Sequence, residues 1–324
     1  MSKILVTGAG GFIGHHLVRR LREKGHNVFG VDIKPNEYVD MGENFYRLDL
    51  RKQTETQFFF ASHKFDEVYA LAADMGGMGF IADSQGHSGD IIWNNAMINL
   101  NTMRSAVSTG VKKYLYTSSA CVYPEFLQEE TNIKPLKESD AFPAMPQDSY
   151  GWEKLFSEIA LQHYAKKSGM DIRIVRFHNI YGPEGDYSSG REKAPAALIR
   201  KVIIAKDKGK PYIEIWGDGE QTRSFCHIND CLKGLELIME GDSQEPINLG
   251  RDEMVSINQL ANSAMKAGKV ELEIKHITGP EGVRGRNSDN TMFKAIHGWT
   301  PEISLDDGIL DTYKWMEEHI HGIA

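Results

Sequence analysis

A glycine-rich turn between an apolar run and a helical pattern is the feature of this sequence that most limits its fold. Residues 3–7 are apolar or β-branched and predict a buried parallel strand. Residues 12–24 carry an apolar residue at every fourth position, as an amphipathic helix does. Residues 27–31 form a second apolar run. A strand, a helix and a second strand in this order predict a right-handed crossover within a parallel sheet.

The alternation of strands and helices continues through the first half of the chain. We expect four more strands and two long helices, at 44–48, 68–72, 113–117 and 172–176 and at 91–109 and 149–167. Alternation of this kind is typical of an α/β protein with a Rossmann-type, doubly wound parallel sheet. A chain of 324 residues is long enough for such a sheet and a second, smaller domain.

The second half of the chain has a looser pattern, with more prolines and glycines. The elements expected there are strands over 213–216 and 246–249 and helices over 226–240 and 305–319. We predict a first domain made of residues 1–177 with 223–250, and a smaller, discontinuous C-terminal α/β domain made of 178–222 with 251–324. Sheets of this type bind ligands at the carboxyl ends of their strands, so the smaller domain should cover that edge.

Charge and cysteine content exclude several classes of protein. Asp and Glu number 45 against 37 for Lys and Arg, a net charge of −8, so nucleic acid and anionic membranes are not expected partners. The three cysteines form no metal-binding motif, and their odd number disfavours a disulfide framework. No apolar run approaches the roughly 18 residues of a membrane-spanning helix. The N-terminus has no signal-peptide pattern, so a cytoplasmic protein without a metal is expected.

The glycine-rich turn has the features of a dinucleotide-binding loop. Gly8, Gly11 and Gly14 would allow a tight turn and the close approach of a pyrophosphate. The free N–H groups of the following helical turn, which includes Phe12 and Ile13, would hold the phosphates. Since strand, turn and helix occur in the required order, we predict a bound dinucleotide.

An acidic residue at the end of the second strand favours NAD over NADP. The Asp32 carboxylate would accept hydrogen bonds from the ribose hydroxyls of NAD and repel the 2′-phosphate of NADP. Asp49 and Leu50 follow the third predicted strand and are candidates for the adenine pocket. For Asp49, an exposed loop acid is an equally good interpretation.

Tyr150 and Lys154 lie four residues apart at the start of a predicted helix and so share one face of it. An ammonium beside a phenol favours the phenolate, which can exchange a proton with a substrate hydroxyl while a hydride moves to or from nicotinamide. Alone, such a pair is more often an exposed surface contact. Here the preceding strand ends in a Ser-Ser-Ala-Cys run, 118–121, at the edge where ligands bind. Together these features predict a hydride-transfer site.

Several longer stretches of the sequence match one known family. They are residues 73–81, 118–126, 137–140, 176–183, 190–197, 216–219, 221–225 and 279–290. Through them the sequence resembles the extended short-chain dehydrogenase/reductase family and, within it, the GDP-mannose 3,5-epimerases. The glycine turn and the Tyr–Lys pair are typical of the wider family, whereas the Met-Gly-Gly-Met-Gly loop and the Gly-Arg-Glu-Lys segment are typical of the narrower one. The resemblance covers nearly the whole chain.

The resemblance implies an isomerase that uses bound NAD to convert GDP-mannose to GDP-L-galactose, or to GDP-L-gulose by inversion of carbon 5 alone. Transient oxidation of carbon 4 would make the protons on carbons 3 and 5 removable. Tyr150, helped by Lys154, would be the acid/base for the 4-hydroxyl, and Ser119 would hydrogen-bond that oxygen. Cys121, on the same side of the strand as Ser119, and Lys193 would exchange protons on opposite faces of the sugar. A neighbouring positive charge should favour the Cys121 thiolate.

The resemblance also implies substrate contacts and a homodimer. The contacts implied beyond Ser119 and Lys193 are Gly77, Gly79, Asn179, Glu192, Lys201, Gln221 and Arg286. The two glycines would let the backbone approach the sugar, and Arg286 would hold the diphosphate through two parallel hydrogen bonds. The smaller domain would bind the nucleotide sugar. Related enzymes usually dimerise through two helices per subunit, here 91–109 and 149–167.

Other interpretations of the sequence stay open. A GDP-4-keto-6-deoxymannose epimerase/reductase, similar to GDP-fucose synthase, shares the Ser/Cys strand end but consumes NADPH, which Asp32 disfavours. A non-catalytic NAD-sensing regulator could use the same fold, although the chain keeps Tyr150, Lys154 and the Ser/Cys strand end. Cys121 could be an inert buried thiol, and Lys193 a solvated surface residue.

Overall fold

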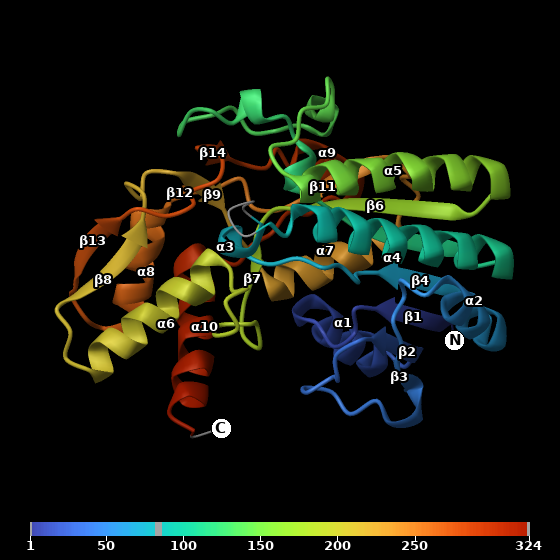
Figure 1. Ribbon diagram of the computed structural model, residues 1–324, viewed down its shortest axis with the longest axis horizontal. Coiled ribbons are helices and arrows are strands. Elements are labelled where there is room, and N and C mark those ends of the chain that lie inside the picture. The colour runs from blue at the N-terminus through green and yellow to red at the C-terminus, as the bar shows by residue number, and fades with distance from the viewer. Residues whose placement is uncertain (1, 82–85, 323–324) are drawn as a thin grey trace.

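The computed structural model describes residues 2–81 and 86–322, and its centre is a sheet of seven parallel strands (Figure 1). The spatial order of the strands is β11-β6-β5-β4-β1-β2-β3. The strands are β1 (Lys3–Thr7), β2 (Asn27–Asp32), β3 (Phe45–Arg47), β4 (Glu67–Ala70), β5 (Lys113–Ser119), β6 (Asp171–Phe177) and β11 (Pro246–Leu249). The order reverses between β1 and β4, which is where open sheets of this type bind ligands.

Helices cover both faces of the sheet. The helices on one face are α2 (Gln53–His63), α4 (Ser88–Thr109) and α5 (Ser149–Ser168), and those on the other are α1 (Phe12–Glu23), α7 (Ile228–Glu240) and α9 (Thr291–His297). Alternate residues of β1 serve the two apolar clusters, because successive side chains of a strand point to opposite faces. Leu5 packs with the first group of helices, and Ile4 and Val6 pack with the second.

A smaller lobe lies beyond the carboxyl edge of the sheet, on the left in Figure 1. Its helices are α6 (Ala194–Asp207), α8 (Ile257–Gly268) and α10 (Leu305–Ile320), and they share one apolar core. Its longest strands, β8 (Tyr212–Trp216) and β13 (Glu273–Ile277), pair in parallel. The remaining strands and the remaining α-helix, a single turn, are short. They are α3 (Met78–Ile81), β7 (Ile180–Tyr181), β9 (Thr222–Ser224), β10 (Cys226–His227), β12 (Met254–Ser256) and β14 (Gly285–Arg286).

The predicted α/β fold with a doubly wound parallel sheet is confirmed. β1 and β11 have the predicted bounds, and each of the other predicted strands of the sheet differs by one or two residues at one or both ends. The division into two domains stays a prediction, and one segment packs differently from it. Phe293 on α9 lies in the apolar core of the sheet, although the prediction assigns 251–324 to the second domain. This short helix returns to the sheet beside β11.

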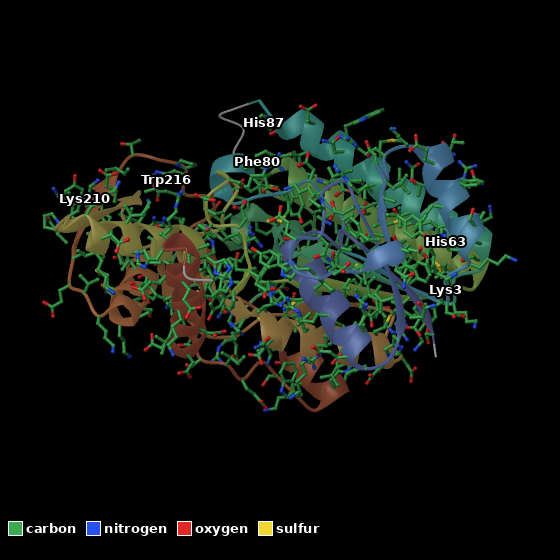
Figure 2. All side chains as sticks on the ribbon, turned by 90° about the horizontal axis from the view of Figure 1, so that it is seen from below. Lys3, His63, Phe80, His87, Lys210 and Trp216 are labelled. Atoms are coloured by element: carbon green, nitrogen blue, oxygen red, sulfur yellow. The ribbon has the colours of Figure 1, made fainter. Side chains whose placement is uncertain are left out.

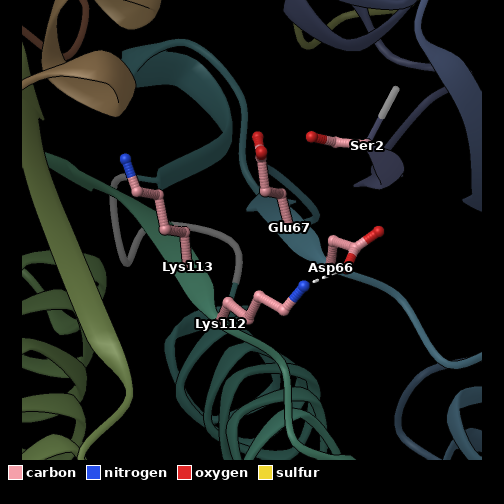
Figure 3. A pocket seen from close by; sticks show the side chains of 5 residues that line it. All are labelled: Ser2, Asp66, Glu67, Lys112 and Lys113. Atoms are coloured by element: carbon pink, nitrogen blue, oxygen red, sulfur yellow. Dashed lines mark hydrogen bonds and ion pairs between the residues drawn. The ribbon is translucent and has the colours of Figure 1, made fainter.

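A polar hollow of about 250 Å³ lies at the opposite, amino edge of the sheet (Figure 3). Its lining comes from the starts of β1, β4 and β5 and consists of Ser2, Asp66, Glu67, Lys112 and Lys113. The candidate catalytic residues lie at the other edge, so this hollow is not the active site. Within residues 2–81 and 86–322, none of the helices combines the length and the apolar character that a bilayer crossing demands.

Candidate active site

The turn between β1 and α1 has no room for side chains at three of its glycines, Gly8, Gly10 and Gly14. Gly8 has a φ of +70°, and a Cβ there would lie 2.9 Å from the backbone that follows β4. A Cβ on Gly14 would lie 2.0 Å from the Gly8 carbonyl oxygen, because α1 begins directly against the turn. Gly11 precedes the helix and provides no side-chain cap, so the N–H groups of Phe12 and Ile13 can bind a ligand. This backbone cradle fits the predicted pyrophosphate.

Asp32, at the end of β2, faces the same turn. Its Oδ2 accepts a hydrogen bond from the Gly10 N–H at 3.0 Å, and its Oδ1 accepts one from the Lys34 N–H at 3.0 Å. Each oxygen keeps a lone pair for a ribose hydroxyl, whereas a 2′-phosphate would meet the negative charge of the carboxylate. The residues present therefore fit NAD.

Asp49 and Leu50 follow β3, and both already have protein contacts. Arg51 donates to the Asp49 carboxylate through Nε and Nη2, each at 2.8 Å, and holds the pKa of that carboxyl below its usual range. Leu50 is buried, and its carbonyl accepts a hydrogen bond from Asn101 at 3.0 Å. A role of these residues toward adenine stays a prediction, with the Asp49 carboxylate committed to Arg51.

Tyr150 and Lys154 lie on the first two turns of α5, which Asp148 caps by accepting a hydrogen bond from the Gly151 N–H at 2.7 Å. Lys154 is 1% exposed. Its Nζ donates to the Thr117 carbonyl at 2.9 Å and lies 5.4 Å from the centre of the Tyr150 ring. The pair is therefore part of the interior between α5 and β5, and the surface-contact interpretation is wrong.

Burial moves both groups toward their uncharged forms. Burial, together with the negative charge of Cys121, raises the pKa of Tyr150 well above 10. Burial also lowers the pKa of Lys154, which the charges of Glu153 and Glu158 partly restore. For Tyr150 this direction is opposite to the one expected from the sequence, because desolvation of the phenolate outweighs the neighbouring ammonium.

Cys121 lies on a turn and not on the strand that precedes it. β5 ends at Ser119, and Ala120–Val122 form a 3₁₀ turn in which the Cys121 N–H donates to Ser119 Oγ at 3.2 Å. Strand alternation is therefore the wrong reason for placing Cys121 beside Ser119, although the turn does bring the two together. α5 packs closely on this turn, since a Cβ on Gly151 would lie 2.1 Å from the Cys121 carbonyl oxygen.

The Cys121 thiol has a positively charged neighbour. Arg286, on β14, donates from Nη1 to Cys121 Sγ at 3.2 Å and from Nε to Gln128 Oε1 at 2.6 Å. The Arg286 residue is only 8% exposed. With Nε engaged, only the two Nη groups remain for a diphosphate. Arg286 as a substrate contact stays a prediction.

Lys193 comes to the site from the second lobe, where it is the N-cap residue of α6. Its segment is joined to the loop after β4. The Gly77 N–H donates to the Arg191 carbonyl at 2.8 Å, and the Asp74 carboxylate pairs with the Arg191 guanidinium at 2.8 Å. A Cβ on Gly77 would lie 2.2 Å from the Glu192 carbonyl oxygen. The contact between two loops thus requires this glycine, a reason different from the predicted approach of a sugar.

Cys121 is close enough to Lys154 and to Lys193 to affect the pKa of each lysine. Burial lowers the pKa of Lys193, and the negative charge of Cys121 partly offsets this. The same charge acts on Lys154. Lys193 is therefore not a fully solvated surface lysine. Tyr150 and Cys121 also share one apolar cluster with Phe80. The structure thus gathers the predicted catalytic groups from β5, α5 and the start of α6.

Asn179 and Glu192, two further predicted contacts, have protein partners at the same edge. Asn179 follows β6 with a φ of +45° and donates to the Ser224 carbonyl at 2.9 Å. The Glu192 carboxylate pairs with Arg200 at 2.6 Å and accepts a hydrogen bond from the Gly190 N–H at 2.7 Å. Their contact with a substrate stays a prediction.

Lys201, Gln221 and Gly79 surround Trp216, at the end of β8. Lys201 Nζ lies 5.9 Å from the Trp216 ring, and a Cβ on Gly79 would lie 3.1 Å from it. Gln221 is buried and donates to the Trp216 carbonyl at 3.3 Å, but its Oε1 has no hydrogen-bond partner within residues 2–81 and 86–322. In Figure 2, Trp216 lies on the smaller lobe and Phe80 lies nearer the centre of the molecule, beside His87. An exposed indole beside an unpartnered amide oxygen suits a planar, polar ligand.

Arg223 is a candidate functional residue that the sequence reasoning did not single out. β9 and β14 pair in the register that places Arg223 beside Arg286. Burial and the charge of Arg286 lower the pKa of Arg223 to about 9, while the charge of Cys121 raises it. Two adjacent guanidinium groups repel each other, and an anion between them would stabilise both. The sequence could have indicated Arg223, because it lies within residues 221–225, one of the stretches that match the known family.

Outside this site, His15, His16 and Glu184 lie close enough together to hold a metal ion. Arg19, however, donates to the Glu184 carboxylate at 2.9 Å, and its charge opposes a cation. His16 Nε2 lies 3.0 Å from the Pro183 carbonyl oxygen. We interpret the cluster as a polar contact between α1 and the loop after β7.

Known proteins similar to this chain act on nucleotide sugars, by their names. Residues 4–250 match the NAD dependent epimerase/dehydratase family. The chain is 50% identical over 321 residues to GDP-mannose 3,5-epimerase 1 of Oryza sativa subsp. indica, a match that covers 98% of this chain and 82% of that protein. It is 29% identical to GDP-L-fucose synthase 1 of Arabidopsis thaliana, covering 98% of this chain and 94% of that protein. A crystal structure of UDP-glucuronic acid 4-epimerase from Bacillus cereus with UDP-glucuronic acid and NAD is similar at a TM-score of 0.80 and 25% identity, covering 98% of this chain and 99% of that one.

Proposed function

The chain belongs to the NAD dependent epimerase/dehydratase family, and on this premise we propose that it inverts GDP-mannose at carbons 3 and 5. Inversion of both carbons gives GDP-L-galactose, and inversion of carbon 5 alone gives GDP-L-gulose. One observation carries the proposal. Cys121 and Lys193, a thiol and an amine from different lobes, lie close enough for the thiol to affect the pKa of the amine. They lie beside a buried tyrosine–lysine pair, in a chain that is 50% identical to a GDP-mannose 3,5-epimerase.

The first step is oxidation of carbon 4, because the protons on carbons 3 and 5 become acidic only beside a ketone. NAD, when bound, supplies the hydride acceptor. Tyr150 takes the proton of the 4-hydroxyl, and the Lys154 ammonium stabilises the phenolate that burial disfavours. Ser119 donates a hydrogen bond to the same oxygen. The reverse transfers restore the hydroxyl after inversion, so no net oxidation occurs.

The second step is inversion at the carbons next to the ketone. The Cys121 thiolate removes a proton from one face of the sugar, and the electrons pass into the enolate. Lys193 returns a proton to the other face, and burial helps it because an ammonium with a lowered pKa is a stronger acid. The thiol and the neutral amine then exchange protons with water before the next inversion.

The second lobe, predicted as residues 178–222 with 251–324, holds the nucleotide sugar. Arg286 of that lobe provides positive charge for the diphosphate, together with Arg223, which lies beside it at the start of the segment 223–250. Trp216, 40% exposed, offers a ring for the guanine, and Gln221 offers an unpartnered oxygen. The remaining proposed contacts are Gly77, Gly79, Asn179, Glu192 and Lys201.

An exposed apolar surface on α4 and α5 supports a homodimer. Trp93 on α4 is 65% exposed, and Trp152, Phe156 and Ile159 on α5 are 47%, 50% and 39% exposed. The three α5 residues recur with helical spacing and therefore share one face. Contact with a second copy would bury them and pair two helices per subunit. The three free cysteines, Cys121 among them, support a cytoplasmic location, where thiols stay reduced.

The alternative functions have less support. The chain is 29% identical to a GDP-L-fucose synthase, the alternative reductase, but 50% identical to a GDP-mannose 3,5-epimerase. Such a reductase would also use NADPH, which the Asp32 carboxylate disfavours. A non-catalytic regulator would not need the buried Tyr150–Lys154 pair with Cys121 and Lys193 beside it.

The decisive experiment is incubation of the purified protein with GDP-mannose in deuterium oxide without added cofactor. The proposal predicts deuterium at carbons 3 and 5 and the appearance of the two L-sugar nucleotides, measured by NMR and chromatography. Recovery of GDP-mannose without deuterium would contradict it. A reductase would instead require NADPH and a 4-keto-6-deoxy substrate.

A further inference from the structure

We infer that Gln128 is a positioning residue that holds the Arg286 guanidinium on the Cys121 sulfur and thereby favours the thiolate. Gln128 is fully buried and lies outside every motif discussed above. The catalytic meaning of this inference rests on the proposed function. The hydrogen bonds that support it, and the alkylation test of Cys121, do not depend on that function.

The side-chain amide of Gln128 can face in only one direction. Its Nε2 donates to the carbonyls of Tyr123 and Pro124, at 3.0 and 3.1 Å. Both carbonyl oxygens are acceptors only, so the amide nitrogen and not the amide oxygen must lie on their side. The opposite atom, Oε1, then accepts the bond from Arg286 Nε at 2.6 Å. The loop after the Cys121 turn thus sets the position of an arginine that is distant in the sequence.

The backbone of Gln128 positions the same arginine a second time. Its carbonyl accepts hydrogen bonds from the N–H groups of Arg284 and Gly285, at 2.9 and 3.1 Å. A Cβ on Gly285 would lie 2.3 Å from the Glu130 carbonyl oxygen, so the two segments are in close contact. β14 and its Arg286 are therefore fixed by both the main chain and the side chain of one glutamine.

The planar guanidinium transmits this restraint to the sulfur. Because Nε is held by Gln128, the plane of the group and the position of Nη1 are set, and Nη1 lies 3.2 Å from Cys121 Sγ. A hydrogen bond from a charged donor strengthens when the acceptor becomes an anion. The contact therefore stabilises the thiolate more than the thiol.

The first test measures the reactivity of Cys121 without any substrate. Iodoacetamide alkylates the thiolate, and mass spectrometry resolves Cys121 from the buried Cys226 and Cys231. We expect Gln128→Met, a change of similar volume, to slow alkylation of Cys121 at pH 7 about tenfold. At pH 9.5 the difference should vanish, because a thiol ionises there without help.

A matched control is Gln147→Met, which removes a glutamine hydrogen bond of 3.1 Å to Glu125 in the neighbouring segment and leaves Arg286 untouched. It should alkylate within about twofold of the unaltered protein. Alkylation of Gln128→Met at the control's rate at pH 7 would overturn the inference. If the methionine variant does not fold, Gln128→Asn keeps the amide but withdraws it by one methylene, and the same slowing is expected.

A double variant tests whether Gln128 acts through Arg286. Arg286→Gln alone should slow alkylation at pH 7, and adding Gln128→Met to it should cause no further slowing. Effects that multiply in full would show that Gln128 acts by another route and would contradict the inference.

The catalytic test follows substrate deuterium exchange and NADH absorbance in parallel. Gln128→Met should lose about tenfold in exchange at pH 7, regain it at high pH, and keep NADH formation within about twofold. Equal losses in both signals at all pH values would indicate a structural role only. If no variant acts on GDP-mannose but alkylation still slows as expected, the proposed function fails and the positioning role stands.

Discussion

The two halves of the active site are held in different ways. Tyr150 and Lys154 belong to the sheet half, where Lys154 is buried and bonded to the main chain of β5. Lys193 belongs to the lobe half and depends on a contact between two loops, through Gly77 and the Asp74–Arg191 pair. One half is therefore part of a continuous core, while the other is assembled between lobes.

This difference separates the two proposed steps of the reaction. Oxidation at carbon 4 depends on the sheet half, whose geometry is fixed by the core. Inversion needs groups on both faces of the sugar, and the second group comes from the other lobe. Loss of Tyr150 or Lys154 should therefore stop all chemistry, whereas changes at the loop contact should impair inversion first.

The largest effect is expected for Tyr150→Phe. Removal of the hydroxyl eliminates the proton acceptor for oxidation, so NADH formation and deuterium exchange should both fall by about 10³-fold, within the range for a general acid–base group. Stopped-flow absorbance and mass spectrometry measure the two signals. Tyr164→Phe, on the same helix, is the control and should keep both. Exchange that persisted in Tyr150→Phe would show that inversion does not need prior oxidation.

A smaller effect, confined to inversion, is expected for Gly77→Ala. The new Cβ would lie 2.2 Å from the Glu192 carbonyl oxygen and push the two loops apart. Displacement of Lys193 by about 1 Å should cost between tenfold and a hundredfold in deuterium exchange, while NADH formation should change by less than about threefold. Gly89→Ala, where a Cβ would meet no atom within 4 Å among the described residues, is the control. Equal loss of both signals would mean that the halves are not separable.

Asp32→Ser should change the preference for NAD over NADP but should not affect the inversion step. Loss of the carboxylate removes the repulsion toward a 2′-phosphate, and the ratio of bound NAD to NADP should fall about tenfold. The measurement is chromatography of nucleotide released from protein that has been loaded with an equal mixture. Asp40→Ser, farther along the same loop, should keep the original ratio. An unchanged ratio in Asp32→Ser would remove Asp32 from cofactor selection.

Acid should weaken the folding of the sheet half. Burial lowers the pKa of His15 on α1 to about 4, against about 6.5 when unfolded. The unfolded chain therefore binds the proton first, and stability is lost as pH falls from about 6.5 toward 4. Between pH 7 and pH 5 this group should cost about 2 kcal/mol of unfolding free energy. Denaturant unfolding measures it, and His15→Gln should flatten the dependence.

The fold was predictable because its signals are local. Alternating apolar strands and amphipathic helices predict the sheet, and β1 and β11 have their predicted bounds. The packing of α9 on the sheet was not predictable in the same way. Thr291–His297 is too short for a helical period to show which core its Phe293 joins.

The proximity of Tyr150 and Lys154 was also predictable, because their spacing places them on one face of a helix that follows the Ser/Cys strand end. The contacts of the lobe half join residues far apart in the sequence. Arg286 and Cys121 are 165 positions apart, and no local pattern indicates that they meet. The direction of the Tyr150 pKa shift was missed for a related reason, since it depends on burial by several elements.

The central claim, that oxidation and inversion use different residues, is tested most directly by Cys121→Ala with GDP-mannose in deuterium oxide. Absorbance of NADH on substrate addition should stay near that of the unaltered protein, because Tyr150 and Lys154 are untouched. Deuterium incorporation and L-sugar formation should fall by about 10²–10⁴-fold. Near-normal formation of GDP-L-galactose by Cys121→Ala would contradict the account and make Cys121 a packed thiol.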